Sequence, residues 1–138
     1  IKINSNKKIK ALDIKTMPYP GFPTDLQQPF SVLLTRCDGT SKIKETIWEN
    51  RFMHIPYLEK MGANAEINGN EVKITGITDL KGTEVVATDL RAGAAMILAG
   101  LIAEGKTEVT SIEHVLRGYE NIVEKLVNVG AKVKIEEI

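Results

Sequence analysis

Hydrophobic positions recur at two spacings along the chain, first every second residue and then every third or fourth. The alternation over 12–16 predicts a strand that ends at Pro18, because proline interrupts a strand. Helical spacing follows over 26–34, and Thr24 with Gln27 has the pattern of a capping box at the start of that helix. The helix should bury one face, which consists of Leu26, Phe30, Leu33 and Leu34.

Shorter elements complete the first half of the chain. The alternation over 43–47 predicts a second strand, with Ile47 as a residue of the core. A helix is expected within 52–61, and Pro56 should make it begin late or bend. The Asn-Gly-Asn turn at 68–70 then predicts a hairpin that leads into another strand.

The second half repeats these patterns. The segment 90–102 is apolar on nearly every side, which predicts a buried helix. Glycine disfavours helices, so we expect Gly93 and Gly100 to allow a neighbouring backbone to approach closely. A helix of ordinary amphipathic pattern follows over 119–126 and ends at Gly130.

Three landmarks occur twice in the same order, which indicates an internal repeat. They are Thr24-Asp25-Leu26 with Thr88-Asp89-Leu90, Arg51 with Arg117, and Gly62-Ala63 with Gly130-Ala131. The copies lie 64, 66 and 68 residues apart, and this slow drift is expected if insertions fall in loops. We therefore expect two related units.

The repeat predicts an α/β protein made of β-α-β-α-β-β units. We place the first unit at 11–76 and the second at 77–138, with the last strand of the second unit absent or supplied from elsewhere. Residues 1–10 should form a terminal hairpin of a preceding unit. Because crossovers between parallel strands are right-handed, the parallel strands should lie side by side with the helices packed behind them.

Composition narrows the classes of function. The chain of 138 residues has 18 basic and 18 acidic side chains, and this balance gives no electrostatic reason to bind nucleic acid or an anionic membrane. Its longest near-apolar run, 92–103, is too short to span a bilayer. The single Cys37 allows no intrachain disulfide and fits a reducing compartment, so we expect a cytoplasmic protein. The chain begins without methionine, and we expect it to be part of a longer protein.

Four segments, in order, resemble the enolpyruvyl transferases. They are Pro-Tyr-Pro-Gly-Phe-Pro-Thr-Asp-Leu-Gln at 18–27, Thr-Ile-Trp-Glu-Asn-Arg-Phe-Met-His at 46–54, Ala-Thr-Asp-Leu-Arg-Ala-Gly-Ala at 87–94 and Arg-Gly-Tyr-Glu at 117–120. The resemblance extends from about residue 9 to the end of the chain. It implies an inside-out α/β barrel fold, in which six β-α-β-α-β-β units form two domains across a cleft. Two units of one domain would stand here.

The resemblance also implies a reaction. Enzymes of this family transfer the enolpyruvyl group of phosphoenolpyruvate to a hydroxyl group and release phosphate, and we expect no cofactor. The Pro-Gly-Phe-Pro-Thr-Asp run is most similar to members that act on the 3-hydroxyl of UDP-N-acetylglucosamine, in the first committed step of peptidoglycan synthesis. Their acid is usually a cysteine on a loop of the other domain, and nothing in this chain corresponds to it. We therefore expect these residues alone to be inactive. An unpaired sheet edge or an uncovered cleft face should make them self-associate, whereas the intact enzyme should be a monomer.

Two aspartates are candidates for the chemistry. The helix dipole favours an acidic residue in the first turn of a helix, which alone explains many residues placed as Asp25 is. The resemblance implies that Asp25 contacts the sugar hydroxyl and takes its proton. Asp89 holds the equivalent place in the second unit, where the resemblance puts it near the reacting carbon. The alternative is that Asp89 only starts a helix.

Arginines are the candidate ligands for anions. Arg117 is predicted at the start of a helix, where a cation has the wrong sign for the helix dipole, and this mismatch indicates an anion opposite it. The resemblance implies that Arg117 binds phosphoenolpyruvate, since a guanidinium suits a carboxylate or phosphate. Arg51 and Arg91 are either substrate ligands or partners of acidic residues that hold the site together.

The remaining candidates have weaker signals. The resemblance implies that Ile47 contacts the UDP-sugar chiefly through its backbone. Trp48 stands where the family usually carries phenylalanine, and it either lines the cleft floor or packs as a partly exposed core aromatic. We expect Cys37 to be a buried structural thiol and His54 and His114 to be structural or surface residues, with no metal site.

Two alternatives stay open. The shikimate-pathway enolpyruvyl transferase shares the architecture, and a test of UDP-N-acetylglucosamine binding would separate the two enzymes. A non-catalytic β-α-β-α-β-β module for ligand or protein binding, or a relative of the RNA-processing cyclases, is a different class of answer. The balanced charge and the lack of a basic stripe disfavour RNA.

Overall fold

The computed structural model describes residues 1–5 and 7–137. The first half of the chain contains β1 (Asp13–Lys15), the 3-10 turn η1 (Thr24–Leu26), α1 (Gln27–Leu34), β2 (Gly39–Lys44), α2 (Ile55–Lys60), β3 (Asn64–Asn68) and β4 (Glu71–Gly76). The second half contains β5 (Glu84–Val86), α3 (Leu90–Ile102), β6 (Glu108–Thr110), α4 (Glu113–Gly118) and α5 (Ile122–Asn128). This mixture of strands and helices confirms the predicted α/β class.

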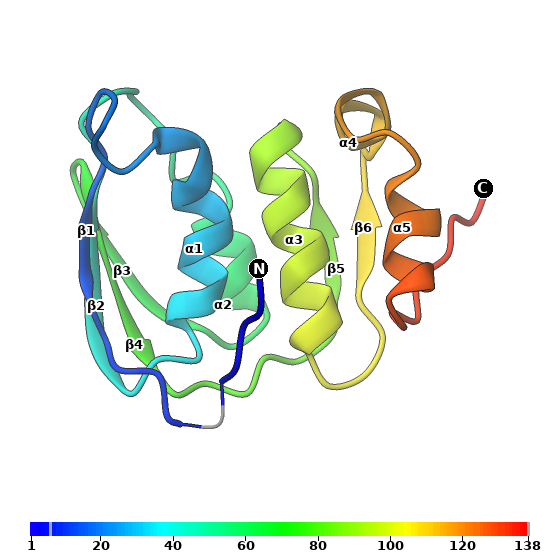
Figure 1. Cartoon of the computed structure of the whole chain (residues 1–138), viewed down its shortest axis with the longest axis horizontal. Helices are drawn as coiled ribbons and strands as arrows, with labels where there is room; N and C mark the ends of the chain where they lie inside the picture. The colour runs from blue at the N-terminus through cyan, green and yellow to red at the C-terminus, as the bar shows by residue number, and fades with distance from the viewer. Residues whose placement is uncertain (6, 138) are drawn as a thin grey trace.

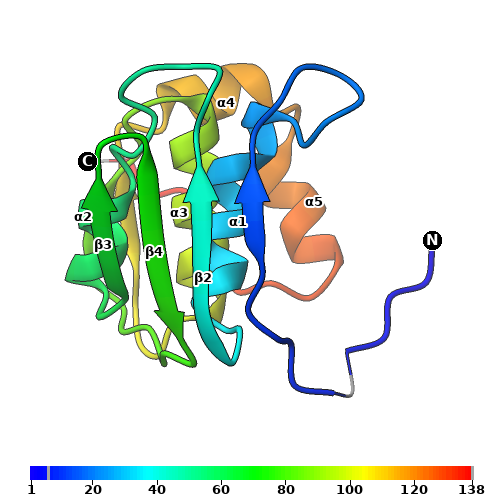
Figure 2. The ribbon, with the colours of Figure 1, turned by 90° about the vertical axis from the view of Figure 1, so that its left-hand side faces the viewer.

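Parallel strands lie side by side in both halves, as predicted. β1 pairs with β2 in a four-stranded sheet of order β1-β2-β4-β3, in which the other neighbours are antiparallel. β5 pairs with β6 in a separate two-stranded sheet. α1 and α3 lie next to each other (Figure 1), behind the four-stranded sheet in the view of Figure 2. One buried apolar cluster therefore extends from this sheet through α1 and α2 into α3.

The short connections form where the sequence predicts them. β3 and β4 make a hairpin, and its turn at 68–70 places Gly69 at a φ of 59°, where glycine is favoured. α2 begins at Ile55 with Pro56 in its first turn, so the predicted late start is confirmed. Gly130 follows α5 at a φ of 97° and ends that helix.

The start of α1 differs from the prediction. No side chain caps it: Pro23 precedes η1, and the Thr24 hydroxyl donates to Glu45 and accepts no N–H of the helix. The predicted apolar face is wrong in part, since Leu26 and Leu33 are exposed. Polar residues that find hydrogen-bond partners inside the molecule occupy the buried face, and they are Gln27, Gln28 and Ser31.

β2 ends before Glu45, so the strand predicted over 43–47 is too long. Ile43 is fully buried, but Ile47 is 39% exposed and lies in the loop that follows. The strand stops where Glu45 turns inward and accepts the backbone N–H groups of Ile47 and Trp48. The expectation that Ile47 belongs to the core is therefore wrong.

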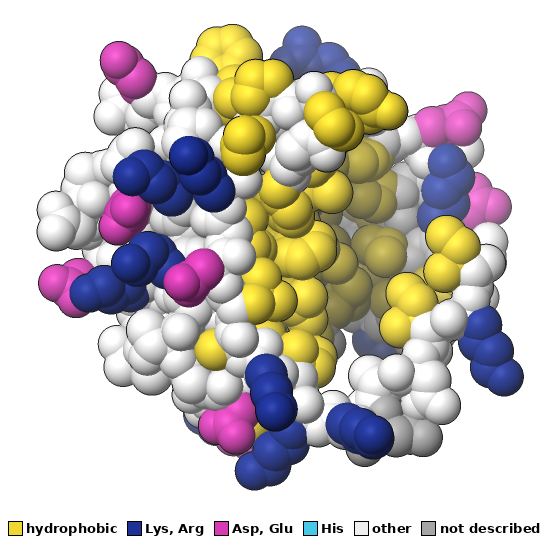
Figure 3. Space-filling model, turned by 60° about the vertical axis from the view of Figure 1, so that its left-hand side comes forward, with side chains coloured by type: hydrophobic (Ala, Val, Ile, Leu, Met, Phe, Trp, Pro, Cys, Tyr) yellow, Lys and Arg dark blue, Asp and Glu magenta, His cyan; other side chains and the backbone are white. Residues whose placement is uncertain are grey.

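α3 is buried on one side only, so the expectation of a helix buried all round is wrong. Met96 and several small residues face the core, whereas Leu98, Leu101 and Ile102 are exposed. Figure 3 shows apolar side chains gathered in a band down one face of the molecule, beside a hollow and flanked by charged side chains. None of the described helices is long and apolar enough to cross a membrane.

The ends of the chain lack the predicted strands. The described part of 1–10 contains only an isolated parallel bridge between Lys10 and Asp38, so the hairpin predicted there is not formed; residue 6 lies outside the described residues. The segment 131–137, where the β-α-β-α-β-β pattern places the first of its two closing strands, contains no strand either. The boundaries of the two units stay predictions.

The glycines of α3 mark close contacts, but with neighbouring side chains instead of the expected neighbouring backbone. A Cβ at Gly93 would collide with Val115 of α4 and would lie 2.9 Å from the Cβ of Ala87. A Cβ at Gly100 would lie 3.1 Å from the Cβ of Thr107, so the space there is less restricted. Gly93 therefore sets how closely α3 packs against α4.

Gly93→Ala should lower the free energy of unfolding by about 1–3 kcal/mol, because overpacking outweighs the gain in helix propensity. Gly100→Ala is the matched control in the same helix, and its effect should stay within about 1 kcal/mol. Urea denaturation of both variants and of the parent protein measures these values. A Gly93→Ala variant as stable as Gly100→Ala would contradict the restricted contact.

Candidate functional site

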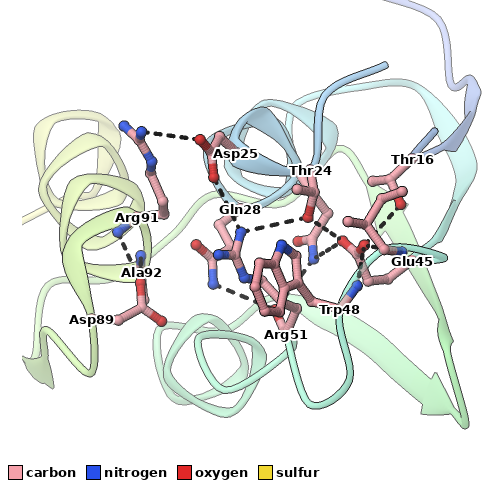
Figure 4. A network of polar contacts seen from close by, with 12 residues as sticks. Thr16, Thr24, Asp25, Gln28, Glu45, Trp48, Arg51, Asp89, Arg91 and Ala92 are labelled. Carbon is pink, nitrogen blue, oxygen red and sulfur yellow. Dashed lines mark hydrogen bonds and ion pairs between the residues drawn. The ribbon is translucent and has the colours of Figure 1, made fainter. Parts of the chain in front are cut away.

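One carboxylate joins the two halves of the molecule through two arginines. Asp25 Oδ2 lies 3.1 Å from Arg91 Nη2, and Asp25 Oδ1 lies 3.4 Å from Arg51 Nη1 (Figure 4). Asp25 belongs to η1, Arg51 to the loop after β2, and Arg91 to the first turn of α3. Pairing with an acidic residue was one of the two roles predicted for Arg51 and Arg91, and both of them pair with Asp25. The Asp25 side chain keeps 52% of its surface exposed.

A tight bend places Asp25. The backbone N–H of Gly21 donates to the Pro18 carbonyl, and that of Met17 donates to the Phe22 carbonyl. A Cβ at position 21 would collide with the Met17 side chain, so the bend requires glycine there. Its own backbone therefore holds the bend and presents η1 beyond the carboxyl end of β1.

Asp89 begins α3, which is the simpler of its two predicted roles. Its Oδ1 accepts the backbone N–H groups of Arg91 and Ala92, both at 2.8 Å. This cap fixes the turn from which the Arg91 side chain reaches Asp25. The Arg91 guanidinium also donates to the Tyr119 hydroxyl at 3.0 Å. That bond, and then the charge of Asp25, raise the pKa of Arg91 above its ordinary value.

An open cavity of about 800 Å³ lies beside this cluster. The loop 45–53 and the β3–β4 hairpin line it, and Arg51 and Trp48 belong to its wall. The Arg51 guanidinium carbon lies 5.5 Å from the centre of the Trp48 ring, within the range of a cation–π contact. Ile47 lines the same cavity. The aspartate–arginine cluster and the cavity therefore share Arg51.

A buried carboxylate lies next to the cavity wall. Glu45 is only 2% exposed and accepts five hydrogen bonds (Figure 4). The donors are the Thr16 hydroxyl at 2.8 Å, the Thr24 hydroxyl at 2.9 Å, Gln27 Nε2 at 3.3 Å, and the backbone N–H groups of Ile47 at 2.9 Å and Trp48 at 3.3 Å. Burial by itself would raise the pKa of Glu45, but the bonds from the two backbone N–H groups and the two threonine hydroxyls together outweigh it and lower the pKa.

Polar side chains of α1 hold the same loop from the core side. Nε2 of Gln27 and Nε2 of Gln28 donate to the Arg51 carbonyl at 3.2 and 3.4 Å. The Ser31 hydroxyl lies 2.8 Å from Nε2 of His54, which is fully buried. Neither this polar layer nor the burial of Glu45 was predicted from the sequence. The available signals were polar residues on one face of α1 and a charged residue between two isoleucines.

The structure corrects the argument for Arg117. The residue lies in the last turn of α4, not at a helix start, and a cation is favourable there. Its guanidinium contacts the Glu113 carbonyl at 3.4 Å and His114 Nδ1 at 3.3 Å, and the ion pairs of Asp25 among the described residues do not include it. α4 lies at the same end of the molecule as the start of α1 (Figure 1), and Tyr119, just beyond α4, bonds to the aspartate–arginine cluster.

The cysteine and the histidines have structural surroundings. Cys37 is a buried thiol, as predicted, and burial raises its pKa. His54 is buried next to Ser31, whereas His114 is exposed on α4. Within residues 1–5 and 7–137, no three histidine, cysteine or carboxylate side chains stand close enough together to hold a metal ion.

Sequence comparison identifies the class of protein that this fold and site belong to. Residues 1–126 match the family described as EPSP synthase (3-phosphoshikimate 1-carboxyvinyltransferase). The chain therefore belongs to the EPSP synthase family of enolpyruvyl transferases.

The curated relatives narrow the comparison within this family. The chain is 60% identical over 134 residues to UDP-N-acetylglucosamine 1-carboxyvinyltransferase of Halothermothrix orenii, and 52% identical over 138 residues to UDP-N-acetylglucosamine 1-carboxyvinyltransferase 2 of Bacillus cereus. These matches cover 97% and 100% of the chain but only 32% of each relative. The chain thus spans about a third of the length of the curated relatives it matches.

Solved structures agree with this assignment. The enolpyruvyl transferase NikO from Streptomyces tendae matches 94% of this chain with a TM-score of 0.86 and 32% identity, and the match covers 30% of NikO. EPSP synthase from Acinetobacter baumannii matches 92% of the chain with a TM-score of 0.66, and the match covers 28% of that protein. At 24% identity this second likeness concerns the fold alone. The predicted enolpyruvyl transferase-like fold is confirmed.

Burial of His54 should make stability depend on pH. Desolvation lowers its pKa from 6.5 to about 4, although the charge of Asp89 acts in the opposite direction. Below about pH 6.5 the unfolded chain binds a proton that the folded chain excludes. The free energy of unfolding should therefore fall from about pH 6.5 to about pH 4, by up to about 3 kcal/mol. Urea denaturation at intervals over this range measures the loss.

His54→Gln is the matched variant, because it removes the ionisable ring but keeps a donor and an acceptor beside Ser31. Its stability should fall less than that of the parent over the same pH range, because it has no imidazole ring to protonate. Glu45 does not mask this difference, since its lowered pKa keeps it ionised until more acid pH. Parallel pH profiles for the variant and the parent would contradict the role of His54.

Proposed function

We propose that this chain forms part of an enzyme that transfers the enolpyruvyl group of phosphoenolpyruvate to the 3-hydroxyl of UDP-N-acetylglucosamine. The observation that carries the proposal is the half-exposed Asp25 carboxylate, held between two guanidinium groups beside an open cavity. Relatives at 51–60% identity that are named UDP-N-acetylglucosamine 1-carboxyvinyltransferase support this acceptor. In this proposal the whole enzyme is a cytoplasmic monomer of peptidoglycan synthesis that uses no cofactor.

The proposed reaction proceeds by addition and elimination. The sugar oxygen attacks C2 of phosphoenolpyruvate while the methylene carbon gains a proton, which gives a tetrahedral ketal. Loss of a proton from the new methyl group and departure of phosphate then restore the double bond. One C–O bond to the sugar forms and one C–O bond to phosphate breaks. This chemistry needs a base for the hydroxyl group and cations for the carboxylate and phosphate.

The residues of this chain take separate roles in the proposal. Asp25 is the base for the sugar hydroxyl, Asp89 lies near the reacting carbon, and Arg117 binds phosphoenolpyruvate. The half-exposed Asp25 carboxylate and the exposed Arg117 guanidinium are both accessible to small molecules, which supports these roles. The further substrate ligands are Ile47, through its backbone, and Arg51 and Arg91.

The shikimate-pathway reaction is the second candidate function. The description of the matching family, which names 3-phosphoshikimate, favours it. The relatives with 51–60% identity favour the UDP-sugar instead, and this identity is well above the 24% to EPSP synthase of known structure. Membership of an enzyme family disfavours the non-catalytic module.

A full-length protein that contains this chain should release phosphate from phosphoenolpyruvate when UDP-N-acetylglucosamine is supplied. Asp25→Ala should lower kcat by about 10²–10⁴-fold, which is the usual contribution of a positioned proton-transfer group. Steady-state phosphate release measures both effects. Asp79→Ala is the control, because Asp79 is an exposed aspartate paired with Arg36 at 2.6 Å, and kcat should stay within about twofold.

The acceptor and the base are tested separately. Turnover with 3-phosphoshikimate and none with UDP-N-acetylglucosamine would contradict the proposed acceptor and favour the second candidate. A rate near that of the parent for Asp25→Ala would remove Asp25 from the mechanism and leave the acceptor unaffected.

Arg117→Ala should raise the KM for phosphoenolpyruvate by about tenfold or more, since a hydrogen bond to a charged group contributes about 1.5–3 kcal/mol. The KM for UDP-N-acetylglucosamine should change little. Kinetics with each substrate varied in turn measure the two constants. Arg36→Ala removes a surface arginine of the first half as the control. An unchanged KM for phosphoenolpyruvate in Arg117→Ala would support a purely structural arginine.

A further inference from the structure

The proposed mechanism uses the groups around the cavity but gives no role to the buried carboxylate beside them. We propose that Glu45 is a positioning residue, whose carboxylate holds the loop 46–53 against the turn that carries Asp25 and so sets the part of the site that receives the nucleotide sugar. The inference rests on the proposed function and deepens it, because it names the group that fixes the geometry of the sugar side.

The two oxygens of Glu45 are divided between the cavity wall and the Asp25 turn. Oε1 accepts the backbone N–H groups of Ile47 at 2.9 Å and Trp48 at 3.3 Å, which fixes the start of the loop that lines the cavity. Oε2 accepts the Thr24 hydroxyl at 2.9 Å, and Thr24 precedes Asp25 in η1. One planar group thus connects both sides of the site (Figure 4).

The carboxyl end of β1 braces the same carboxylate. The Thr16 hydroxyl donates to Glu45 Oε1 at 2.8 Å and accepts the backbone N–H of Thr46 at 2.8 Å. The Thr46 hydroxyl in turn donates to the Thr16 carbonyl. The first residues of the loop are therefore tied to β1 as well as to Glu45, which restricts movement of Ile47 and Trp48.

Arg51, the ligand shared by the cavity and the aspartate cluster, is held by the same network. Its Nη1 lies 3.5 Å from the Thr24 hydroxyl oxygen, which also bonds to Glu45. Gln27 donates both to Glu45 and to the Arg51 carbonyl. A shift of the Glu45 carboxylate would therefore move the backbone and the side chain of Arg51 relative to Asp25.

Folding alone does not require a charge at this position. A buried carboxylate opposes folding unless its lone pairs are satisfied, and an apolar side chain at the end of a strand would be buried without that cost. The partners of Glu45 instead lie on the segments that carry or adjoin Asp25, Ile47 and Arg51. Their bonds also lower its pKa, so the carboxylate is ionised and accepts all of them at neutral pH.

Steady-state kinetics of the full-length protein with Glu45→Ala and Glu45→Gln test the inference. Glu45→Ala loses every bond and should raise the KM for UDP-N-acetylglucosamine about 10- to 100-fold. The KM for phosphoenolpyruvate, assigned to Arg117 in the other half, should change by less than about threefold. Glu45→Gln keeps an oxygen that can accept the two backbone N–H groups of the loop, and it should recover most of the affinity.

Asp13→Asn is the matched control. Asp13 is an exposed carboxylate on β1 that accepts the backbone N–H of Lys42 at 3.0 Å, and it is not part of the cavity wall. Its KM values should equal those of the parent. A merely structural role of Glu45 would lower kcat in proportion to the folded fraction and leave both KM values unchanged. That result, or kinetics identical to the parent, would overturn the inference.

A milder variant covers the case in which the Glu45 variants do not fold. Thr16→Val removes one donor to the carboxylate and the acceptor of the Thr46 N–H, and it should raise the KM for UDP-N-acetylglucosamine several-fold. An unchanged KM there would also overturn the inference. The parent protein separates the two failures. An inactive parent rejects the proposed function, whereas an active parent with unaltered variants rejects only the role of Glu45.

Discussion

The site depends on one contact, in which Asp25 of the first half lies between Arg51 of the same half and Arg91 of the other half. Exposed ion pairs of this kind add little to stability, and salt weakens them. Their importance here is geometric, because Asp25, Arg51 and Arg91 meet only if three separate segments are placed correctly. Two other carboxylates support that placement: the buried Glu45 accepts the backbone N–H of Ile47 in the loop of Arg51, and the partly buried Asp89 caps the turn of Arg91.

The same edge of the molecule provides all of these segments. η1, the loop that follows β2, the start of α3 and α4 each come after the carboxyl end of a parallel strand, where ligands bind in open α/β sheets. The repeat places an aspartate at the equivalent point in each half, but their surroundings differ. Asp25 turns outward to two guanidinium groups, whereas Asp89 turns back to the N–H groups of its own helix. The two aspartates thus occupy similar positions in the sequence pattern, and their neighbours decide what each one contacts.

Local pattern predicted the features that depend on neighbours in sequence. The parallel pairs, the turn at 68–70 and the late start at Pro56 follow from periodicity and from backbone chemistry. Local pattern did not predict burial that depends on a distant partner. Gln27 and Glu45 are both buried, and they bond to each other across 18 residues. The short α4 has too few residues to show a period, so Arg117 was assigned to the wrong end of a helix. Apolar spacing likewise could not show that Leu98 would be exposed.

Trp48 has a consequence for how the molecule can be observed. It is the only tryptophan among the 138 residues, more than half of its surface is exposed at the cavity, and a guanidinium lies 5.5 Å from its ring. Indole emission responds to nearby charge and to water. A molecule that enters the cavity, or that draws the Arg51 side chain away, alters both. The chain therefore carries its own optical reporter in the wall of this cavity.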